Sequence, residues 1–343
     1  MPGVASAGVR ESGTGAMHLV DYLDGAPVKQ VPTRNGFGEG LIEAGRRSRD
    51  VVAICADLSE STRMEGFKKA FPEQYIEIGV AEQLLVAMAA GLASAGKTPF
   101  IASYAMFNPG RSWEQVRTTL ALNETNVKIA GAHAGVSVGP DGATHQAIED
   151  IAIMRVIPKM TVVVPCDSIQ TRKATLAVAE RFGPAYLRFA RAESAVITTE
   201  ETPFELGRAQ TFRDGSDVAI VACGLLVYNA LLAAEELAKS DGIACRVINN
   251  HTIKPMDEDA VLAAARECRA VVTVEEHQVH GGMGSRVAEI LAEREPVPVE
   301  FVGVHDRFGQ SGTPRELIEH YGMGPTAIRD AVKRALARKG PRA

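Results

Sequence analysis

Residues 75–104 read YIEIGVAEQLLVAMAAGLASAGKTPFIASY, and this stretch contains the pattern that decides the fold. A short β-branched run at 75–79 precedes an apolar stretch with helical spacing at 80–96, which ends at a glycine. A second apolar run follows at 99–104. A strand, a helix and a strand in this order are typical of a parallel sheet.

The same alternation continues on both sides of this unit. Apolar runs that predict strands lie at 51–56, 128–135, 161–165 and 185–190, and stretches that predict helices lie at 33–50, about 111–122, near 146–155 and at 168–182. Because the strands are almost continuously apolar, both faces of the sheet are expected to be covered by helices. The sequence therefore predicts an α/β fold with a doubly wound parallel sheet.

A change of composition divides the chain after residue 191. Residues 192–215 are polar and rich in threonine, which favours a linker containing an edge strand. Alternation then resumes, with predicted strands at 217–223, 244–250, 270–276 and 297–304 and predicted helices at 227–239, 257–267, 283–294 and beyond 313. We expect a mobile leader at 1–30, with Met1 or Met17 as the natural start, a first domain at 31–191, the linker, and a smaller α/β domain at 216–343.

The composition of the 343 residues excludes several classes of protein. Hydrophobic residues make up 46% and charged residues 23%, which excludes a mostly disordered chain. The 37 Lys and Arg against 42 Asp and Glu give a net charge of −5, which argues against a broadly basic nucleic-acid surface. The five cysteines form no CxxC pair, and no apolar run approaches the roughly 20 residues of a membrane helix. We expect a cytoplasmic protein that binds neither nucleic acid nor membranes.

Glu82 stands between the first strand of the opening unit and its helix. Its neighbours Val80, Ala81, Leu84 and Leu85 provide no charge partner. One interpretation is a first-turn glutamate that the helix dipole favours. The other is a carboxylate placed in an apolar cleft for proton exchange.

A glycine-rich loop follows the predicted strand at 128–135. It reads HAGVSVGPDGATHQ from His133 to Gln146 and carries Asp141 and His145. Ligands of open parallel sheets bind beyond the carboxyl ends of the strands, and such a loop costs entropy to order, so a ligand-binding role is favoured. The alternatives are a turn with surface histidines and a metal site, although His133 and His145 lack the helical spacing of an HExxH motif.

Two further pairs lie at predicted strand ends. Arg188 and Arg191 suit a phosphate or, alternatively, an interdomain salt bridge. Tyr104 and Phe107 suit a stacking wall for a flat heterocycle or, alternatively, packing in the core. Together with the glutamate and the histidine loop, these pairs describe a site for an aromatic ring, a sugar-like chain and a phosphate.

These motifs resemble one known family. The segments EIGVAEQ (77–83), SYAMF (103–107), GAHAGVSVGPDGATHQAIED (131–150) and RFARAE (188–193) resemble, in order and spacing, the pyrimidine-binding domain of transketolase. The segments VINNHTIKPMD (247–257) and VTVEEHQVHGGMGSRVAEIL (272–291) are similar to the transketolase C-terminal domain. The resemblance covers about residues 33–338 and implies these two domains for the chain.

The resemblance implies thiamine diphosphate as cofactor and phosphorylated sugars as substrates. Glu82 matches the glutamate that hydrogen-bonds the aminopyrimidine of the cofactor and activates it, and Tyr104 and Phe107 match the aromatic wall around that ring. Asp57 matches a cofactor-side aspartate, and Arg111 has a counterpart in deoxyxylulose-phosphate synthases.

The remaining matches concern the substrate. His133 and His145 match histidines that contact sugar hydroxyls and help proton transfer, and Asp141 matches an aspartate at a donor hydroxyl. Ser61, Arg188 and Arg191 match residues that contact the phosphate.

The sequence departs from the family in one respect. Transketolases also have a pyrophosphate-binding domain, in which a GDG motif and a downstream Asn hold Mg²⁺ and the diphosphate. This chain has no GDG, and its early Asp24-Gly25 has Asn35 only eleven residues on, too few for a strand, a turn and a helix. The resemblance therefore implies the C-terminal subunit of a split transketolase, with no metal ligand assigned to this chain. A separate N-terminal subunit would carry the GDG motif and most Mg²⁺ ligands, and we expect a homodimer of this chain within an α2β2 assembly.

Three other functions share parts of the pattern. The β subunits of 2-oxo acid dehydrogenases have a similar glutamate and C-terminal domain but lack the DGATHQ loop. Deoxyxylulose-phosphate synthases have the loop but are longer single chains and typically carry arginine where this chain has His133. A non-catalytic subunit that only binds a partner is the third alternative, and the intact Glu82, Asp141 and His145 argue against it. We favour ketol transfer in carbohydrate metabolism, with pentose phosphates as the first candidate substrates.

Overall fold

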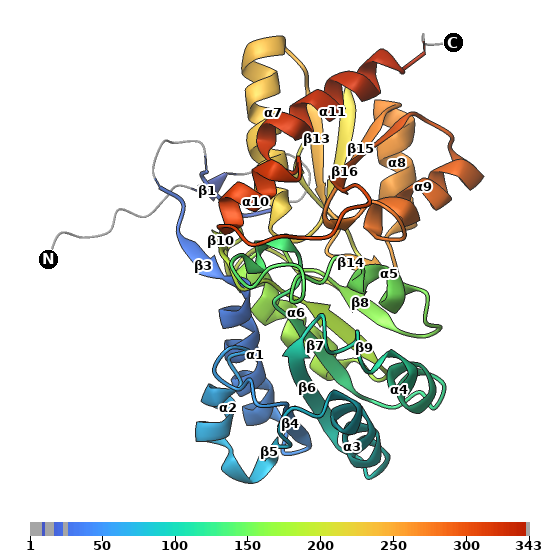
Figure 1. Cartoon of the computed structure of the whole chain (residues 1–343). Coiled ribbons are helices and arrows are strands. Elements are labelled where there is room, and N and C mark those ends of the chain that lie inside the picture. Colours follow the sequence, from blue (N-terminus) through green and yellow to red (C-terminus); the bar gives the residue numbers. More distant parts are fainter. Residues whose placement is uncertain (1–8, 11–16, 23–26, 341–343) are drawn as a thin grey trace, which may run out of the picture.

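Two α/β domains lie one above the other (Figure 1). This computed structural model describes residues 9–10, 17–22 and 27–340. The first domain, blue to green in Figure 1, lies below the second domain, yellow to red. Of the helices that the structure describes, none combines the length and the apolar character that crossing a bilayer requires.

A seven-stranded sheet forms the centre of the first domain, with the strand order β14-β8-β9-β7-β6-β4-β5. Six of these strands are mutually parallel: β4 (Val51–Cys55), β5 (Tyr75–Glu77), β6 (Thr98–Tyr104), β7 (Lys128–Ala132), β8 (Thr161–Val163) and β9 (Ala185–Arg188). The seventh, β14 (Thr252–Lys254), comes from the second half of the chain and pairs antiparallel with β8. The sequence placed residues 252–254 in the second domain and did not predict that they extend the sheet of the first domain.

Helices cover both faces of this sheet. Those of the first domain are α1 (Thr33–Arg47), α2 (Glu65–Ala70), α3 (Glu82–Ser94), α4 (Trp113–Gln115), α5 (Asp150–Arg155) and α6 (Ser168–Glu180), with short 3₁₀ turns η1 (Pro72–Gln74) and η3 (Val136–Val138) and a π-helical turn η2 (Val116–Ala121). Side chains of α1, α2 and α6 bury one face, and those of α3, α5 and η2 bury the other. The doubly wound arrangement predicted from the apolar strands is confirmed.

The second domain contains a five-stranded sheet with the order β11-β13-β12-β15-β16. Its elements are β11 (Gln210–Arg213), β12 (Val218–Ala222), β13 (Cys245–Asn249), β15 (Val271–Gln278), β16 (Val299–Val304), α7 (Leu226–Asp241), α8 (Glu258–Cys268), α9 (Met283–Arg294), α10 (Pro314–His320) and α11 (Pro325–Ala337). Only β11 among these strands is antiparallel to its neighbour. It lies within residues 192–215, where the sequence predicted an edge strand.

The described part of the leader is less loose than the sequence predicted. Leu19 and Tyr22 are buried among the apolar side chains of the second domain. Short antiparallel pairs join β1 (Val9–Arg10) to β2 (Leu19–Val20) and β3 (Gln30–Pro32) to β10 (Glu193–Ala195). Residues 1–8, 11–16 and 23–26 lie outside the described residues, so the expected mobility of the leader is not tested there.

Several predicted boundaries shift for local reasons. The strand predicted at 128–135 ends at Ala132 because His133 has a φ of +55°, which a β-strand cannot include. The helix predicted at about 111–122 is a short α-helical turn that continues as the π-helical turn η2. The helix predicted near 146–155 begins only at Asp150, so the histidine loop is longer than the sequence pattern indicated.

Helices α1 and α6 approach closely because α1 presents glycine to α6. A Cβ added at Gly36 would lie 1.9 Å from the carbonyl oxygen of Ser168. The contrasting case is Gly91 in α3, where an added Cβ would meet nothing within 4 Å.

We predict that Gly36→Ala lowers the free energy of unfolding by roughly 1–3 kcal/mol, because backbone must move to admit the methyl group. The matched control Gly91→Ala should raise it by up to about 1 kcal/mol, since alanine favours helix and the site is open. Urea unfolding of the purified variants measures both changes. An unchanged midpoint for Gly36→Ala would contradict the close approach of the two helices.

Candidate active site

The carboxyl edge of the first sheet gathers the predicted site residues. Strands β9, β7, β6 and β4 are successive neighbours, so their carboxyl ends lie side by side. The ends of these strands and the loops after them carry every predicted site residue except Glu82, which begins α3 after β5: Asp57, Ser61, Tyr104, Phe107, Arg111, His133, Asp141, His145, Arg188 and Arg191.

An aromatic cluster occupies the middle of this edge. The ring of Tyr104 stacks on that of His133, with 4.1 Å between the ring centroids and 20° between the planes. Phe107 lies 6.2 Å from Tyr104 and meets His145 edge-on, with centroids 5.3 Å apart. The two aromatic residues are therefore in contact with both histidines, and their use as a stacking wall for a flat heterocycle stays a prediction.

His133 is fully buried, and neither ring nitrogen has a hydrogen-bond partner among the described residues. Burial, with the nearby charges of Arg34 and Arg191, lowers the pKa of His133 to about 3. A neutral imidazole then provides one donor and one acceptor at ordinary pH. Leaving both unpaired in the interior costs about 1–3 kcal/mol each, and a polar group that bonds to either nitrogen would remove part of this cost.

Glu82 is 3% exposed and pairs with Arg111. Arg111 donates from Nη1 to Oε2 of Glu82 at 3.1 Å, and its guanidinium carbon lies 5.3 Å from the centre of the Phe107 ring. The sequence neighbourhood of Glu82 contained no charge partner because the partner is 29 residues further along the chain. One carboxylate, one guanidinium and one aromatic face thus meet at the start of α3.

Three arginines line a cavity of about 470 Å³ beside this cluster: Arg34, Arg63 and Arg191. Burial, together with the charges of Arg63 and Arg191, lowers the pKa of Arg34. Arg191 pairs with Asp141 at 3.1 Å, and Arg34 donates to the carbonyl of Ser61 at 2.9 Å. Glu193 also lines the cavity, so three guanidinium groups face two carboxylates, those of Glu193 and Asp141, and the excess of positive charge favours an anion there.

Arg34 and Arg63 were not predicted from the sequence as site residues. Arg34 is the second residue of α1, where the helix dipole disfavours a cation. This unfavourable position is the one feature of the sequence that could have indicated a role for Arg34 in the site. Arg63 has a φ of +65° and donates from Nε to Oδ1 of Asn35 at 2.8 Å. Only the folded chain brings these residues to the end of β9.

Arg188 lies away from this cavity in a buried ion pair. It donates from Nε to Oδ2 of Asp150 at 2.8 Å and from Nη2 to the carbonyl of Glu276, in the second domain, at 2.8 Å. Asp150 also accepts the hydroxyl of Tyr186 at 2.7 Å. The ion pair of Arg188 lies within the first domain and only its hydrogen bond to Glu276 crosses to the second, so this geometry favours a structural role for Arg188 without being an interdomain salt bridge. Of the two arginines, we keep the phosphate interpretation for Arg191.

Ser61 and Asp57 lie at the rim of the site. The Tyr104 hydroxyl donates to Oγ of Ser61 at 3.4 Å, which places Ser61 between the aromatic cluster and the arginine cavity. Asp57 is exposed, and its N–H donates to Glu77 at 2.7 Å. Among the described residues no three His, Cys, Asp or Glu side chains gather in a way that would hold a metal ion.

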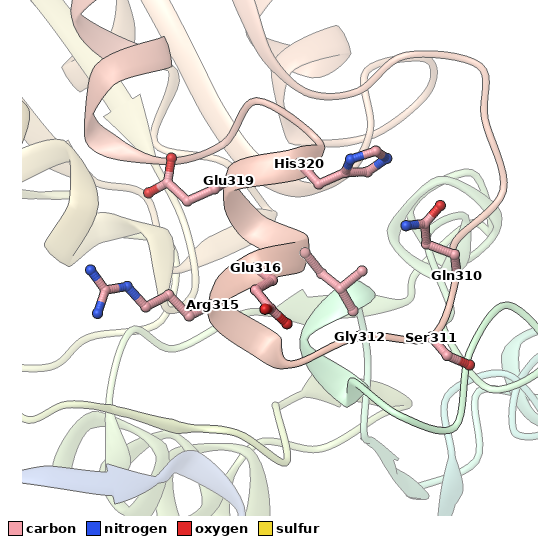
Figure 2. Close-up of a pocket in the computed structure, with 8 residues that line it drawn as sticks. Gln310, Ser311, Gly312, Arg315, Glu316, Glu319 and His320 are labelled. Carbon is pink, nitrogen blue, oxygen red and sulfur yellow. The ribbon is translucent and has the colours of Figure 1, made fainter.

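A second hollow of about 690 Å³ lies along α10 in the other domain (Figure 2). Figure 2 shows that Arg315 and Glu319 point to one side of α10, whereas His320 points to the other side, where Gln310 lies on the preceding loop. Because its polar groups do not converge, this hollow lacks the character of a reaction site.

Two family descriptions match the chain in order. The transketolase pyrimidine-binding domain matches residues 29–195, and the transketolase C-terminal domain matches residues 207–328. The chain belongs to the transketolase family.

Proteins similar to this transketolase-family chain include two subunits with stated substrates. The 6-deoxy-6-sulfo-D-fructose transketolase subunit SqwH of a Clostridium species is 42% identical over 306 residues, which cover 89% of this chain and 95% of that protein. An apulose-4-phosphate transketolase subunit of Phocaeicola vulgatus is 40% identical over 299 residues, which cover 87% and 95%. A solved structure, described as a split gene transketolase in an inactive β4 tetramer, matches with a TM-score of 0.83 and 43% identity and covers 91% of this chain and 100% of that one.

We predict that His133 stays neutral from pH 5 to 8. Because the folded-state pKa of about 3 lies below the unfolded value near 6.5, the stabilisation from a neutral His133 is complete above pH 6.5. It is lost as the pH falls from 6.5 toward 3. NMR of ring-labelled chain, with the resonance assigned through His133→Asn, tests this directly. An inflection of the His133 resonance between pH 5.5 and 7.5 would show that the ring is solvated.

Proposed function

We propose that the chain is the C-terminal subunit of a thiamine-diphosphate-dependent transketolase that transfers a two-carbon ketol unit between phosphorylated sugars. The observation that carries the proposal is the convergence, at one sheet edge, of buried Glu82, an aromatic wall, an unpaired buried His133 and a cavity lined by arginines. An acid, a ring-binding face, a polar contact and an anion site are the parts that such a reaction needs from this half of an enzyme.

The residues present fit the ring half of the cofactor. Phe107 and Tyr104 offer flat faces for an aminopyrimidine, and Glu82 lies at the start of α3 with its carboxylate held by Arg111. The bound cofactor supplies the carbanion chemistry. In this proposal, Glu82 holds a proton at the ring nitrogen of the aminopyrimidine, and the aromatic wall orients that ring and excludes water.

The other residues serve the sugar. His133 offers an unpaired donor and acceptor to sugar hydroxyls, and His145 lies against the same aromatic wall. Asp141, which is paired with Arg191, accepts a hydrogen bond from a hydroxyl of the donor sugar. Arg34 and Arg191 bind the phosphate.

A separate N-terminal subunit completes the site in this proposal. The sequence has no GDG motif, and the described residues contain no metal-binding cluster, so the diphosphate and Mg²⁺ need ligands from elsewhere. Val80 and Leu84 on either side of Glu82 are 69% and 49% exposed, which supports a protein partner, or a second copy of this chain in an α2β2 assembly, at this edge. The similar split transketolase is described as inactive when it forms a β4 tetramer, which supports the need for a partner.

Co-expression with the neighbouring reading frame tests the proposal. Two-carbon transfer should require both chains, thiamine diphosphate and Mg²⁺. Full activity of this chain alone would contradict the split arrangement, and a complex without transfer activity toward any phosphorylated ketose would contradict the function.

We predict that Glu82→Gln lowers kcat of the complex by at least ~10², because the amide cannot exchange the proton. The matched control Glu73→Gln changes an exposed carboxylate of the same domain and should leave kcat unchanged. Steady-state kinetics of the two reconstituted variants measures the difference. An unaltered kcat in Glu82→Gln would remove the acid–base role.

We predict that Arg191→Ala raises KM at least ~10-fold for phosphorylated sugars and raises KM for the free sugars less, since the charge-assisted hydrogen bond to phosphate is lost only with the first class, whereas the loss of the ion pair with Asp141 affects both. Arg46→Ala, an exposed arginine in the last turn of α1, is the control. Equal increases for both classes of sugar would argue against phosphate contact.

A further inference from the structure

A carboxylate of the second domain is hydrogen-bonded to the histidine loop, residues 133–146. The N–H of Ser137, in the turn η3, donates to Oε1 of Glu276 at 2.5 Å. Glu276 lies in β15 of the second domain and is 3% exposed. A buried carboxylate of one domain is therefore bonded to the backbone of a loop in the other.

The loop backbone is shaped to admit this carboxylate. Gly135 has a φ of +86°, and a Cβ added there would lie 2.3 Å from the carboxyl carbon of Glu276. No other residue fits between the loop and the carboxylate without moving one of them. The close contact therefore requires glycine at position 135 of the loop and the side chain of Glu276 in β15.

The same loop forms part of the candidate active site. His133 lies two residues before Gly135, and Ser137 and Val138 line the cavity of the three arginines. Gln146 donates to the carbonyls of Val136 and Gly139 and so closes the loop on its other side. A shift of η3 would move both the wall of the cavity and the backbone that carries His133.

We propose that Glu276 is a positioning residue, whose carboxylate fixes loop 133–139 so that His133 and the wall of the arginine cavity are set for the substrate. The identity of that substrate rests on the proposed function, whereas the contact and its effect on the loop do not. The Glu276–Ser137 hydrogen bond is then one of the contacts through which the second domain acts on the loop, beside the bond from Gln146 to the carbonyl of Gln310.

The charges around Glu276 give the contact a pH dependence. Burial raises the pKa of Glu276 to about 7, Arg188 of β9 and the N–H of Ser137 act in the opposite direction, and Asp150 of α5 adds to the increase. Since this folded-state pKa lies above the unfolded value, the stability that Glu276 contributes is complete below the unfolded pKa and is lost as the pH rises through about 7. The ionised carboxylate, however, is the stronger acceptor for Ser137.

Local order and global stability should therefore respond to pH in opposite directions. Protection of the Ser137 amide should increase as the pH rises from 6 to 8, while the contribution of Glu276 to the free energy of unfolding decreases. A merely structural role would move both quantities together.

Hydrogen exchange of the full chain, corrected for the intrinsic rate at each pH, tests this. Glu276→Gln should make exchange in 133–139 about 10-fold faster at pH 8 and remove its dependence on pH, because the neutral amide is a weaker acceptor. Glu275→Gln is the matched control: Glu275 is the adjacent buried carboxylate, but it accepts the N–H groups of Met283 and Gly284 within the second domain. It should accelerate exchange only at the start of α9.

The complex with the partner subunit gives the second measurement. Glu276→Gln should raise KM for phosphorylated sugars about 10-fold and change kcat less than about 3-fold, because the wall of the arginine cavity belongs to the loop whereas Glu82 lies outside it. Unchanged exchange in 133–139 overturns the positioning role whether or not the complex is active. If exchange in 133–139 becomes faster in Glu276→Gln but the complex has no transfer activity, the proposed function is rejected and the positioning role is kept. If Glu276→Gln fails to fold, the pH series of the native chain decides, and constant protection between pH 6 and 8 overturns the proposal.

Discussion

The buried guanidinium of Arg188 fixes three parts of the molecule relative to one another. It joins the end of β9 to Asp150, where α5 begins after the histidine loop, and to the backbone of Glu276 in the second domain. Removing two charges from water costs several kcal/mol per ion, so this pair is stable only while its partners are all in place. The hydrogen bonds of Arg188 offset this cost only when the sheet, the loop and the second domain are arranged as observed. The positions of the candidate site residues depend on that arrangement.

Much of the architecture followed from the sequence because parallel strands impose their geometry. Near-continuous apolar runs indicate the sheet, and the carboxyl ends of such strands must lie at one edge, so the sequence alone predicts that Tyr104, His133 and Arg191 lie together. Their contacts depend on side chains from neighbouring strand ends, which periodicity along a single strand cannot describe. The strand β14 was missed for a related reason, because three residues of the second half of the chain pair with a sheet formed by the first half.

The arginines show where sequence reasoning stopped. Arg188 and Arg191 are only three residues apart, yet the first is buried in an ion pair and the second lies in an open cavity with Arg34 and Arg63. No local pattern distinguishes them, because the difference is whether the ion pair is buried, as with Asp150, or partly exposed, as with Asp141. Glu276 was not predicted as a functional residue because a carboxylate that follows Glu275 in an apolar strand suggests an exposed position. In the structure, the loop of the first domain covers it.

The same contacts explain why these two domains stay in one chain while a third is proposed to be separate. One cluster of buried apolar side chains runs from α3 of the first domain to α8 and α9 of the second, and β14 extends the first sheet. Dividing the chain here would expose that apolar surface and leave the Arg188 pair without the carbonyl of Glu276. At the edge around Glu82, by contrast, the exposed side chains include the apolar Val80 and Leu84, and the unpaired buried groups include the nitrogens of His133, which a ligand can satisfy. A boundary between subunits is tolerated where a cofactor and a modest apolar patch join the parts, and is costly where a common core and a buried charge do.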